Sequence, residues 1–247
     1  AGRIEVFDNG AAREEASDAA RRRAREVFHL SDAPALLFAG SLGRQKNLPR
    51  ILEAAALLRR RGVDFQLLFA GQGPDERRAR ELARRLDLLG TVRFLGHLSD
   101  ETLLAALYAE SALCLFPAQS ISAGHVVHEA AVQGTPSLMI AGSASSALVE
   151  NGVNGIICGD SAKSVAAAIE AFLASPERMR AMRLKARETA PSSWDAVIDR
   201  VEARYEALAG MDRSVLRRKR GFFRKELERV DLTLEKRVMD LIWRFLK

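Results

Sequence analysis

Residues 35–47 read ALLFAGSLGRQKN, and this stretch decides the fold class. Its first five residues form an unbroken apolar run, which is typical of a strand buried on both faces of a parallel sheet. Two glycines, Gly40 and Gly43, follow directly and allow the backbone to turn sharply at the end of the strand. The basic residues Arg44 and Lys46 come next, so we expect them at the carboxyl end of the sheet.

The same pattern recurs on both sides of this stretch. Further short apolar runs, predicted as strands, lie at 3–7, 65–70, 91–95, 112–116, 137–141 and 156–158. Segments with helical periodicity lie between and after them, at 12–29, 48–61, 75–89, 100–109, 125–133, 161–174, 176–188 and 193–208. Buried strands that alternate with amphipathic helices are typical of βαβ units. We therefore expect an α/β fold with a doubly wound, Rossmann-like parallel sheet and a helical C-terminal extension.

Composition excludes several classes of protein. The chain has 247 residues, of which 48% are hydrophobic and 28% charged, which excludes wholesale disorder. No apolar stretch approaches the ~20 residues that a membrane-spanning helix needs. Cys114 and Cys158 lie inside apolar runs, so we expect buried, reduced thiols and a cytoplasmic location.

The net charge of +6 belongs to the C-terminal end of the chain. Residues 211–247 hold 12 Lys and Arg against 6 Asp and Glu, which leaves residues 1–210 with 26 of each sign. A neutral body argues against a nucleic-acid-binding domain, which would carry a basic face. We therefore expect a neutral globular domain over residues 1–210 and a basic amphipathic helical tail over residues 211–247.

Ligands of a doubly wound sheet bind at the carboxyl ends of its strands, so the loops there hold the candidate site. After the 35–39 run, Gly40 and Ser41 allow close approach of the backbone, and Arg44 and Lys46 suit a diphosphate. A Gly-rich loop with two solvated bases is the alternative. The loop lacks the Gly-Lys-Ser/Thr of a Walker motif.

Two shorter loops follow the next two strands. Gly71 begins the segment Gly71-Gln72-Gly73-Pro74, whose simplest interpretation is a tight structural connector. Gly96, His97 and Leu98 follow the 91–95 run, where His97 is either an ordinary loop histidine or a catalytic group.

The segment after the 112–116 run carries more polar chemistry. Gly124 opens a predicted helix whose first backbone N–H groups can bind an anion. Glu129 lies four residues after His125, so the two share a face of that helix, and the carboxylate is placed to accept hydrogen bonds from ribose hydroxyls. A surface glutamate is the alternative. His125 and His128 are three residues apart, but no third ligand has suitable spacing, so we expect no metal site.

Taken together, these residues resemble the family 4 glycosyltransferases of the GT-B fold, specifically their C-terminal, nucleotide-sugar-binding half. The resemblance runs from about residue 3 to residue 208. The motifs that carry it, in the family's order and spacing, are Phe7-Asp8-Asn9-Gly10, Gly-x-Leu-x-x-x-Lys-Asn at 40–47, Ala70-Gly71-Gln72-Gly73-Pro74, Val92-Arg93-Phe94-Leu95-Gly96-His97-Leu98, Glu129-Ala130 with Gly134-Thr135-Pro136, and Glu150-Asn151-Gly152-Val153-Asn154-Gly155.

The resemblance implies a role for individual residues. Lys46 looks like the lysine that neutralises the donor diphosphate, with Arg44 as a second candidate cation for catalysis. Glu129 looks like the carboxylate that holds the ribose. The backbone at Gly124 and His125 resembles the segment that grips the phosphates, and Gly96 to Leu98 the stretch that lines the nucleobase. The further donor-binding residues that the resemblance implies are Gly40, Ser41, Gly71, Gly96, His97, Leu98 and Val126.

The implied activity is retaining transfer of a sugar from a nucleotide diphosphate sugar to a cell-surface glycan or lipid. The donor class that we favour is a UDP-sugar. The family needs no cofactor and no Asp-x-Asp metal site, because bases stabilise the departing diphosphate electrostatically. Such an enzyme would act in the cytoplasm, at the inner face of the cell membrane.

The sequence departs from the family at two residues and in one domain. Ser41 replaces a common arginine, and Arg44 is its candidate substitute. Ile121 replaces the first acid of the paired-glutamate motif, and isoleucine cannot accept hydrogen bonds from the donor sugar. No segment supplies the N-terminal acceptor-binding domain, so we expect a partial or impaired enzyme. The alternative is a non-catalytic subunit that binds a partner or a nucleotide without transfer.

Residues 213–247 combine basic and large apolar side chains. Three interpretations remain open for them: contact with an anionic membrane surface, packing on the absent N-terminal domain, or, third, binding to nucleic acid. For the chain as a whole we expect no nucleic-acid partner.

Overall fold

The structure of the chain, a computed structural model, describes residues 7, 10, 15–118 and 124–209. The chain forms two compact units, Ala1–Val197 and Ile198–Lys247. The boundary between these units falls inside helix α8 (Trp194–Ala209), where Val197 is the last buried residue of the described chain. The predicted tail over 211–247 lies outside the described residues, as does the predicted strand at 3–7 except for Phe7.

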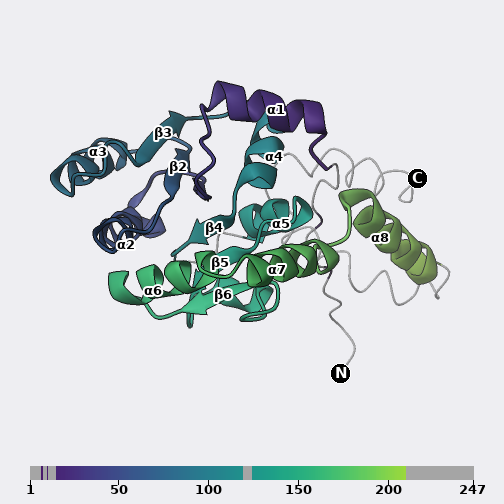
Figure 1. The fold of residues 1–247 in the computed structure, drawn as a ribbon. Coiled ribbons are helices and arrows are strands. Elements are labelled where there is room, and N and C mark those ends of the chain that lie inside the picture. Colours follow the sequence, from purple (N-terminus) through teal and green to yellow (C-terminus); the bar gives the residue numbers. More distant parts are fainter. Residues whose placement is uncertain (1–6, 8–9, 11–14, 119–123, 210–247) are drawn as a thin grey trace. The chain divides into compact units, whose positions relative to one another are not determined.

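The first unit contains a parallel sheet of six strands (Figure 1). The strands are β1 (Ala35–Ala39), β2 (Gln66–Ala70), β3 (Val92–Gly96), β4 (Leu113–Phe116), β5 (Ser137–Ile140) and β6 (Gly155–Cys158). Their order in the sheet is β3-β2-β1-β4-β5-β6. This order confirms the predicted doubly wound topology, because the chain winds outward from β1 in one direction and then from β4 in the other.

Helices connect the strands and cover both faces of the sheet (Figure 1). The other helices described are α1 (Asp18–Val27), α2 (Leu48–Arg60), α3 (Glu76–Arg85), α4 (Glu101–Glu110), α5 (Gly124–Val132), α6 (Ala162–Leu173) and α7 (Pro176–Glu188). Two short 3₁₀ helices, η1 (Arg44–Lys46) and η2 (Ala144–Leu148), were not predicted.

Two helices are shorter than the sequence pattern predicted. The helix expected over 12–29 begins only at Asp18, where Ser17 is the N-cap and its hydroxyl accepts a hydrogen bond from the Ala20 amide at 3.2 Å. The helix expected over 75–89 ends at Arg85, because Asp87 adopts a left-handed backbone conformation with φ of 57°.

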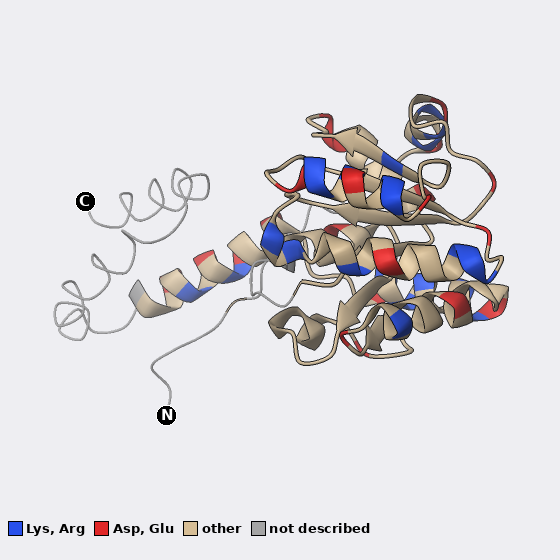
Figure 2. Ribbon diagram, turned by 90° about the vertical axis from the view of Figure 1, so that its left-hand side faces the viewer, with Lys and Arg blue, Asp and Glu red and all other residues tan. Residues whose placement is uncertain are grey.

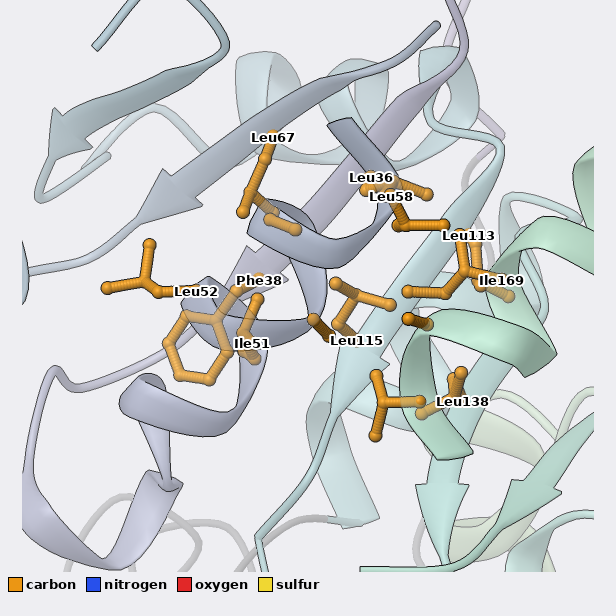
Figure 3. Close-up of a cluster of buried hydrophobic side chains, with 14 of the residues drawn as sticks. Leu36, Phe38, Ile51, Leu52, Leu58, Leu67, Leu113, Leu115, Leu138 and Ile169 are labelled. Atoms are coloured by element: carbon orange, nitrogen blue, oxygen red, sulfur yellow. The ribbon is translucent and has the colours of Figure 1, made fainter. Parts of the chain in front are cut away.

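The core lies on both faces of the sheet, as the unbroken apolar run of β1 predicted. Leu36 and Phe38 point to the face covered by α2, α3 and α6, where they pack with residues such as Leu52 (Figure 3). Leu37, between them in sequence, packs on the opposite face against α1, α4 and α5. All five residues of β1 are buried, so a single polar substitution there would place an unpaired group in the core.

Basic and acidic residues are interspersed along the helices (Figure 2). One partly buried cluster joins α1 to α4: Glu110 accepts from Arg21 at 2.7 Å and from Arg25 at 3.0 Å. Cys114 and Cys158 are buried free thiols, as predicted. Within the described ranges, no helix has the length and apolar character needed to cross a membrane.

Candidate functional site

The candidate site lies at the point where the sheet changes direction, between the carboxyl ends of β1 and β4. Parallel doubly wound sheets open a crevice there, because the connections from the two strands lead to opposite sides. The Lys46 side chain comes from η1, after β1, and its Nζ lies 5.1 Å from the centroid of the Phe116 ring at the end of β4. Partial burial lowers the pKa of Lys46, since it removes water from the ammonium group.

Glycines with positive φ lie at the carboxyl ends of three neighbouring strands, directly after β1 and β2 and as the last residue of β3. These angles are 133° at Gly40, 143° at Gly71 and 75° at Gly96. Backbone hydrogen bonds connect these three positions. The Gly40 amide donates to the Ala70 carbonyl at 2.9 Å, and the Gly71 amide donates to the Gly96 carbonyl at 2.7 Å. The backbone therefore turns out of the sheet at three adjacent positions, as the glycines predicted.

The loops pack so closely that only glycine fits at positions 71 and 73. A Cβ atom on Gly71 would lie 1.9 Å from the Gly40 carbonyl oxygen, and one on Gly73 would lie 2.5 Å from the Leu42 oxygen. The Leu42 amide also donates to the Gln72 carbonyl at 3.0 Å. The connector interpretation of this segment is therefore confirmed, and a role for Gly71 in donor binding stays a prediction.

The other predicted residues of the first three loops are exposed or pack on the core. Ser41, Arg44 and His97 are exposed, and no ion pair of Arg44 occurs among the described residues. Leu98 packs against the core cluster under α1, α4 and α5, together with Val126. The structure thus brings Lys46 to the switch point, and it leaves Arg44 in solvent.

Helix α5 is described from Gly124 onward, and the backbone N–H groups in the first turn of an α-helix lack partners within the helix. His125 in this turn is exposed, and its ring centroid lies 6.4 Å from that of Trp194. Gly10, the last residue of the Phe7-Asp8-Asn9-Gly10 motif, packs on the same tryptophan: a Cβ atom there would lie 2.7 Å from the Trp194 Cα. Ile121, where the family has an acid, lies outside the described residues.

Glu129 lies one turn into α5 and is partly buried. Its Oε2 atom accepts a hydrogen bond from the Tyr108 hydroxyl on α4 at 3.1 Å. Burial raises the pKa of Glu129, while the Tyr108 hydrogen bond and His125 act in the opposite direction. Glu129 is therefore a partly exposed, hydrogen-bonded carboxylate, and its role toward a ribose stays a prediction.

Sequence reasoning missed three aromatic residues of this region: Tyr108, Phe116 and Trp194. Phe116 carried a weak signal, because it is the last residue of a strand whose carboxyl end was expected at the site. Tyr108 lies 21 residues before its partner and Trp194 lies 69 residues after His125. No local pattern reports such distant contacts. Nowhere in the described ranges do three or more His, Cys, Asp or Glu side chains gather as a metal site.

The model of one protein family matches the larger part of the chain. That family is described as glycosyl transferases group 1, and the match covers residues 20–189. Among curated proteins, an alpha-D-kanosaminyltransferase of Streptomyces kanamyceticus is 29% identical over 162 residues, which cover 65% of this chain and 42% of that protein. The chain spans less than half the length of the curated relatives it matches.

Solved structures that share the fold include the following two. Anabaena HepE in complex with UDP and glucose superposes with a TM-score of 0.72 at 18% identity, over 82% of this chain and 57% of that one. The C-terminal domain of the group 1 protein LpcC from Francisella tularensis superposes with a TM-score of 0.64 at 14% identity. The second alignment covers 73% of this chain and 96% of the LpcC domain.

Proposed function

Because the chain belongs to the group 1 glycosyltransferases, we propose that residues 1–210 bind the nucleotide-sugar donor of such an enzyme. The observation that carries this proposal is the position of Lys46 against the Phe116 ring at the switch point of the sheet. A partly dehydrated ammonium group interacts more strongly with a diphosphate than a fully solvated one. The backbone N–H groups at the start of α5 suit the remaining phosphate oxygens.

The ribose of the nucleotide is the proposed partner of Glu129. The Tyr108 hydroxyl occupies one carboxylate oxygen, and a carboxylate retains further acceptor capacity for a ribose hydroxyl. Gly96, His97 and Leu98, at the end of the neighbouring strand β3, are the proposed lining of the nucleobase. A UDP-sugar is the donor we favour, which the UDP in the HepE structure supports.

The proposed chemistry is transfer with retention of anomeric configuration and without a metal ion. The charge that develops on the departing diphosphate would be stabilised by Lys46, with Arg44 as a second cation. Transfer to a glycan or lipid acceptor would require an acceptor-binding domain, since the chain spans less than half of its relatives. The LpcC fragment, covered almost completely, supports the assignment of this chain to the C-terminal half.

Calorimetric titration of the chain with UDP, GDP and ADP tests the proposal. We expect one nucleotide to bind, and Lys46→Ala to weaken its affinity about tenfold or more, because a charge-assisted contact is lost. Glu129→Ala should also weaken binding. Lys163→Ala on α6, an exposed lysine, and Glu177→Ala on α7, an exposed glutamate, are matched controls that should leave the affinity unchanged. Binding of no nucleotide would overturn the assignment.

A non-catalytic, glycosyltransferase-like subunit is the second candidate function, and Ile121 is the observation that favours it. An apolar side chain in place of the family's acid removes a hydrogen-bond acceptor for the donor sugar. Ile121→Glu, assayed with a supplied acceptor domain, separates the two candidates. A gain in donor hydrolysis or transfer indicates an impaired enzyme, and no gain indicates a binding role.

For residues 213–247, which include many basic residues, we propose a separate role: peripheral contact with an anionic membrane. Flotation with vesicles of neutral or of partly anionic phospholipid, with and without these residues, tests it. Equal recovery of both chains with the anionic vesicles would count against membrane contact and favour the alternative that these residues pack on an N-terminal domain.

A further inference from the structure

Tyr108 and Glu129 form a hydrogen bond between two helices next to the candidate site. Tyr108 lies in the last turn of α4, and its side chain is buried, with only 1% of the residue exposed. Its hydroxyl donates to the Glu129 Oε2 atom on α5 at 3.1 Å. This bond therefore connects a residue deep in the core to the carboxylate proposed to hold the ribose.

The backbone at Tyr108 is held in place independently of this bond. Its carbonyl oxygen accepts from the Ser111 amide at 2.9 Å and from the Thr135 hydroxyl at 2.6 Å. Thr135 belongs to the turn after α5, and its own amide donates to the Ala130 carbonyl on that helix at 2.8 Å. Thr135 thus links the end of α4 to α5 through two hydrogen bonds. The Tyr108 hydroxyl is therefore a donor with a fixed position.

The hydrogen bond uses only one oxygen of the carboxylate. No described residue donates a hydrogen bond to the Oε1 atom of Glu129. A carboxylate held at one oxygen has lost most of its rotational freedom, so its other oxygen can accept from a ligand at a lower entropic cost. A phenylalanine at position 108 would fill the same space without supplying the donor.

We propose that Tyr108 is the positioning residue of the donor site: it orients the Glu129 carboxylate for the ribose hydroxyls and holds it in the ionised form. The inference rests on the proposed function, because it needs Glu129 to contact the nucleotide. Tyr108 itself does not contact the ligand in this proposal. Its effect passes through one hydrogen bond.

The groups around Glu129 decide the direction of the pH effect. Burial raises the pKa of its carboxyl, and Glu101 on α4 acts in the same direction. Tyr108 and His125 lower the pKa of Glu129. Cys114 on β4 is a further titratable group that interacts with this carboxylate, whose charge raises the pKa of the thiol. On α7, Arg187 lies near the other end of α5, where it contacts the Gln133 carbonyl at 3.5 Å. Removal of the Tyr108 hydroxyl therefore raises the pKa of Glu129.

The closing experiment measures the affinity for UDP-glucose as a function of pH. UDP-glucose replaces UDP because its second phosphate is esterified to glucose, so it lacks the ionisation near pH ~6 that the free terminal phosphate of UDP has. The variants are Tyr108→Phe, Glu129→Gln and the double variant, each compared with the unmodified chain from about pH 5 to about pH 8. Glu129→Gln is also the control for pH effects that do not involve this carboxyl group.

Three results are expected. Tyr108→Phe binds UDP-glucose more weakly than the unmodified chain, and its affinity falls at a higher pH as the solution is acidified. Glu129→Gln removes this acid limb. The double variant binds like Glu129→Gln alone, because the hydroxyl then has no carboxylate to orient. An acid limb at the same pH in Tyr108→Phe and the unmodified chain would overturn the inference.

A second measurement separates this inference from the proposed function. The Glu129 carboxyl carbon is titrated by NMR in the ligand-free chain and in Tyr108→Phe. A higher pKa in the variant supports the ionising role of Tyr108, and an equal pKa overturns it, whether or not a nucleotide binds. Failure of the unmodified chain to bind any nucleotide sugar would instead overturn the proposed function.

Discussion

The ammonium nitrogen of Lys46 lies 5.1 Å from the centroid of the Phe116 ring, so one contact joins the loop after β1 to the end of β4. The ring is buried, with 1% of the residue exposed, and packs with Val127 of α5 and Met139 of β5. It provides a rigid apolar base for a charged side chain at the centre of the sheet. A cation–π contact of this kind contributes roughly 0.5–2 kcal/mol, depending on how dry the site is.

The first prediction concerns this contact. Phe116→Leu should weaken nucleotide binding about two- to fivefold, because Lys46 loses the ring that orients it. Calorimetric titration measures the effect. In a chain that already carries Lys46→Met, Phe116→Leu should weaken nucleotide binding no further, since the cation that the ring orients is already absent. An equal loss with and without Lys46 would show that Phe116 acts through general packing.

The second prediction concerns the glycine turns at the ends of the strands. Gly71→Ala should lower the free energy of unfolding by at least about 2 kcal/mol, because its Cβ would overlap the Gly40 carbonyl oxygen and φ is 143°. Urea unfolding measures the change.

Two alanine variants serve as controls for Gly71. Gly62→Ala has positive φ but open space and should cost about 1 kcal/mol, and Gly43→Ala, with ordinary φ and open space, should cost less than about 0.5 kcal/mol. Similar losses in all three variants would exclude the overlap as the cause.

The third prediction concerns Arg183 on α7. This mostly buried guanidinium donates to the Ala109 carbonyl at 2.8 Å and to the Ser111 carbonyl, and burial lowers its pKa. Arg183→Met should lower the free energy of unfolding by about 2 kcal/mol, because two backbone acceptors at the C-terminal end of α4 lose a donor. The exposed Arg180 on the same helix is the control, and Arg180→Met should change the free energy of unfolding by less than about 0.5 kcal/mol. An equal loss of unfolding free energy in the two variants would contradict a stabilising role for the Arg183 hydrogen bonds.

The fourth prediction concerns the buried thiols. Burial raises the pKa of Cys114 to about 12 and that of Cys158 to about 11. In the unfolded chain thiols ionise near pH ~8.5, so between that pH and the folded values only the unfolded state loses protons. The free energy of unfolding should therefore fall as pH rises through this window, by about 1.4 kcal/mol per pH unit for each thiol.

Unfolding by urea at several alkaline pH values checks this slope, and Cys114→Ala should reduce it. Both thiols should also resist iodoacetamide in the folded chain near pH ~8, where the thiolate is scarce, and react after unfolding. Rapid alkylation of the folded chain would contradict the burial of these two residues.

The elements and the class of the fold were readable from the sequence. The apolar runs at 35–39 and 65–70 predicted β1 and β2 to within one residue, because strands buried on both faces leave an uninterrupted hydrophobic signal. Helix ends were less accurate, as at Asp18 and Arg85, since they depend on caps and single backbone angles. The glycines at positions 40 and 71 were predicted as turns from residue type alone.

The sequence by itself thus determined which residues lie at the carboxyl end of the sheet and which of them carry charge, because periodicity and residue type are local properties. Only the tertiary structure decided which of them meet. The winding of the sheet places β1 next to β4, and only then does Lys46 contact Phe116. The packing of α4 on α5 brings the Tyr108 hydroxyl to Glu129. Such pairs are set by how helices and strands pack across long separations in the chain, and no local pattern records that geometry.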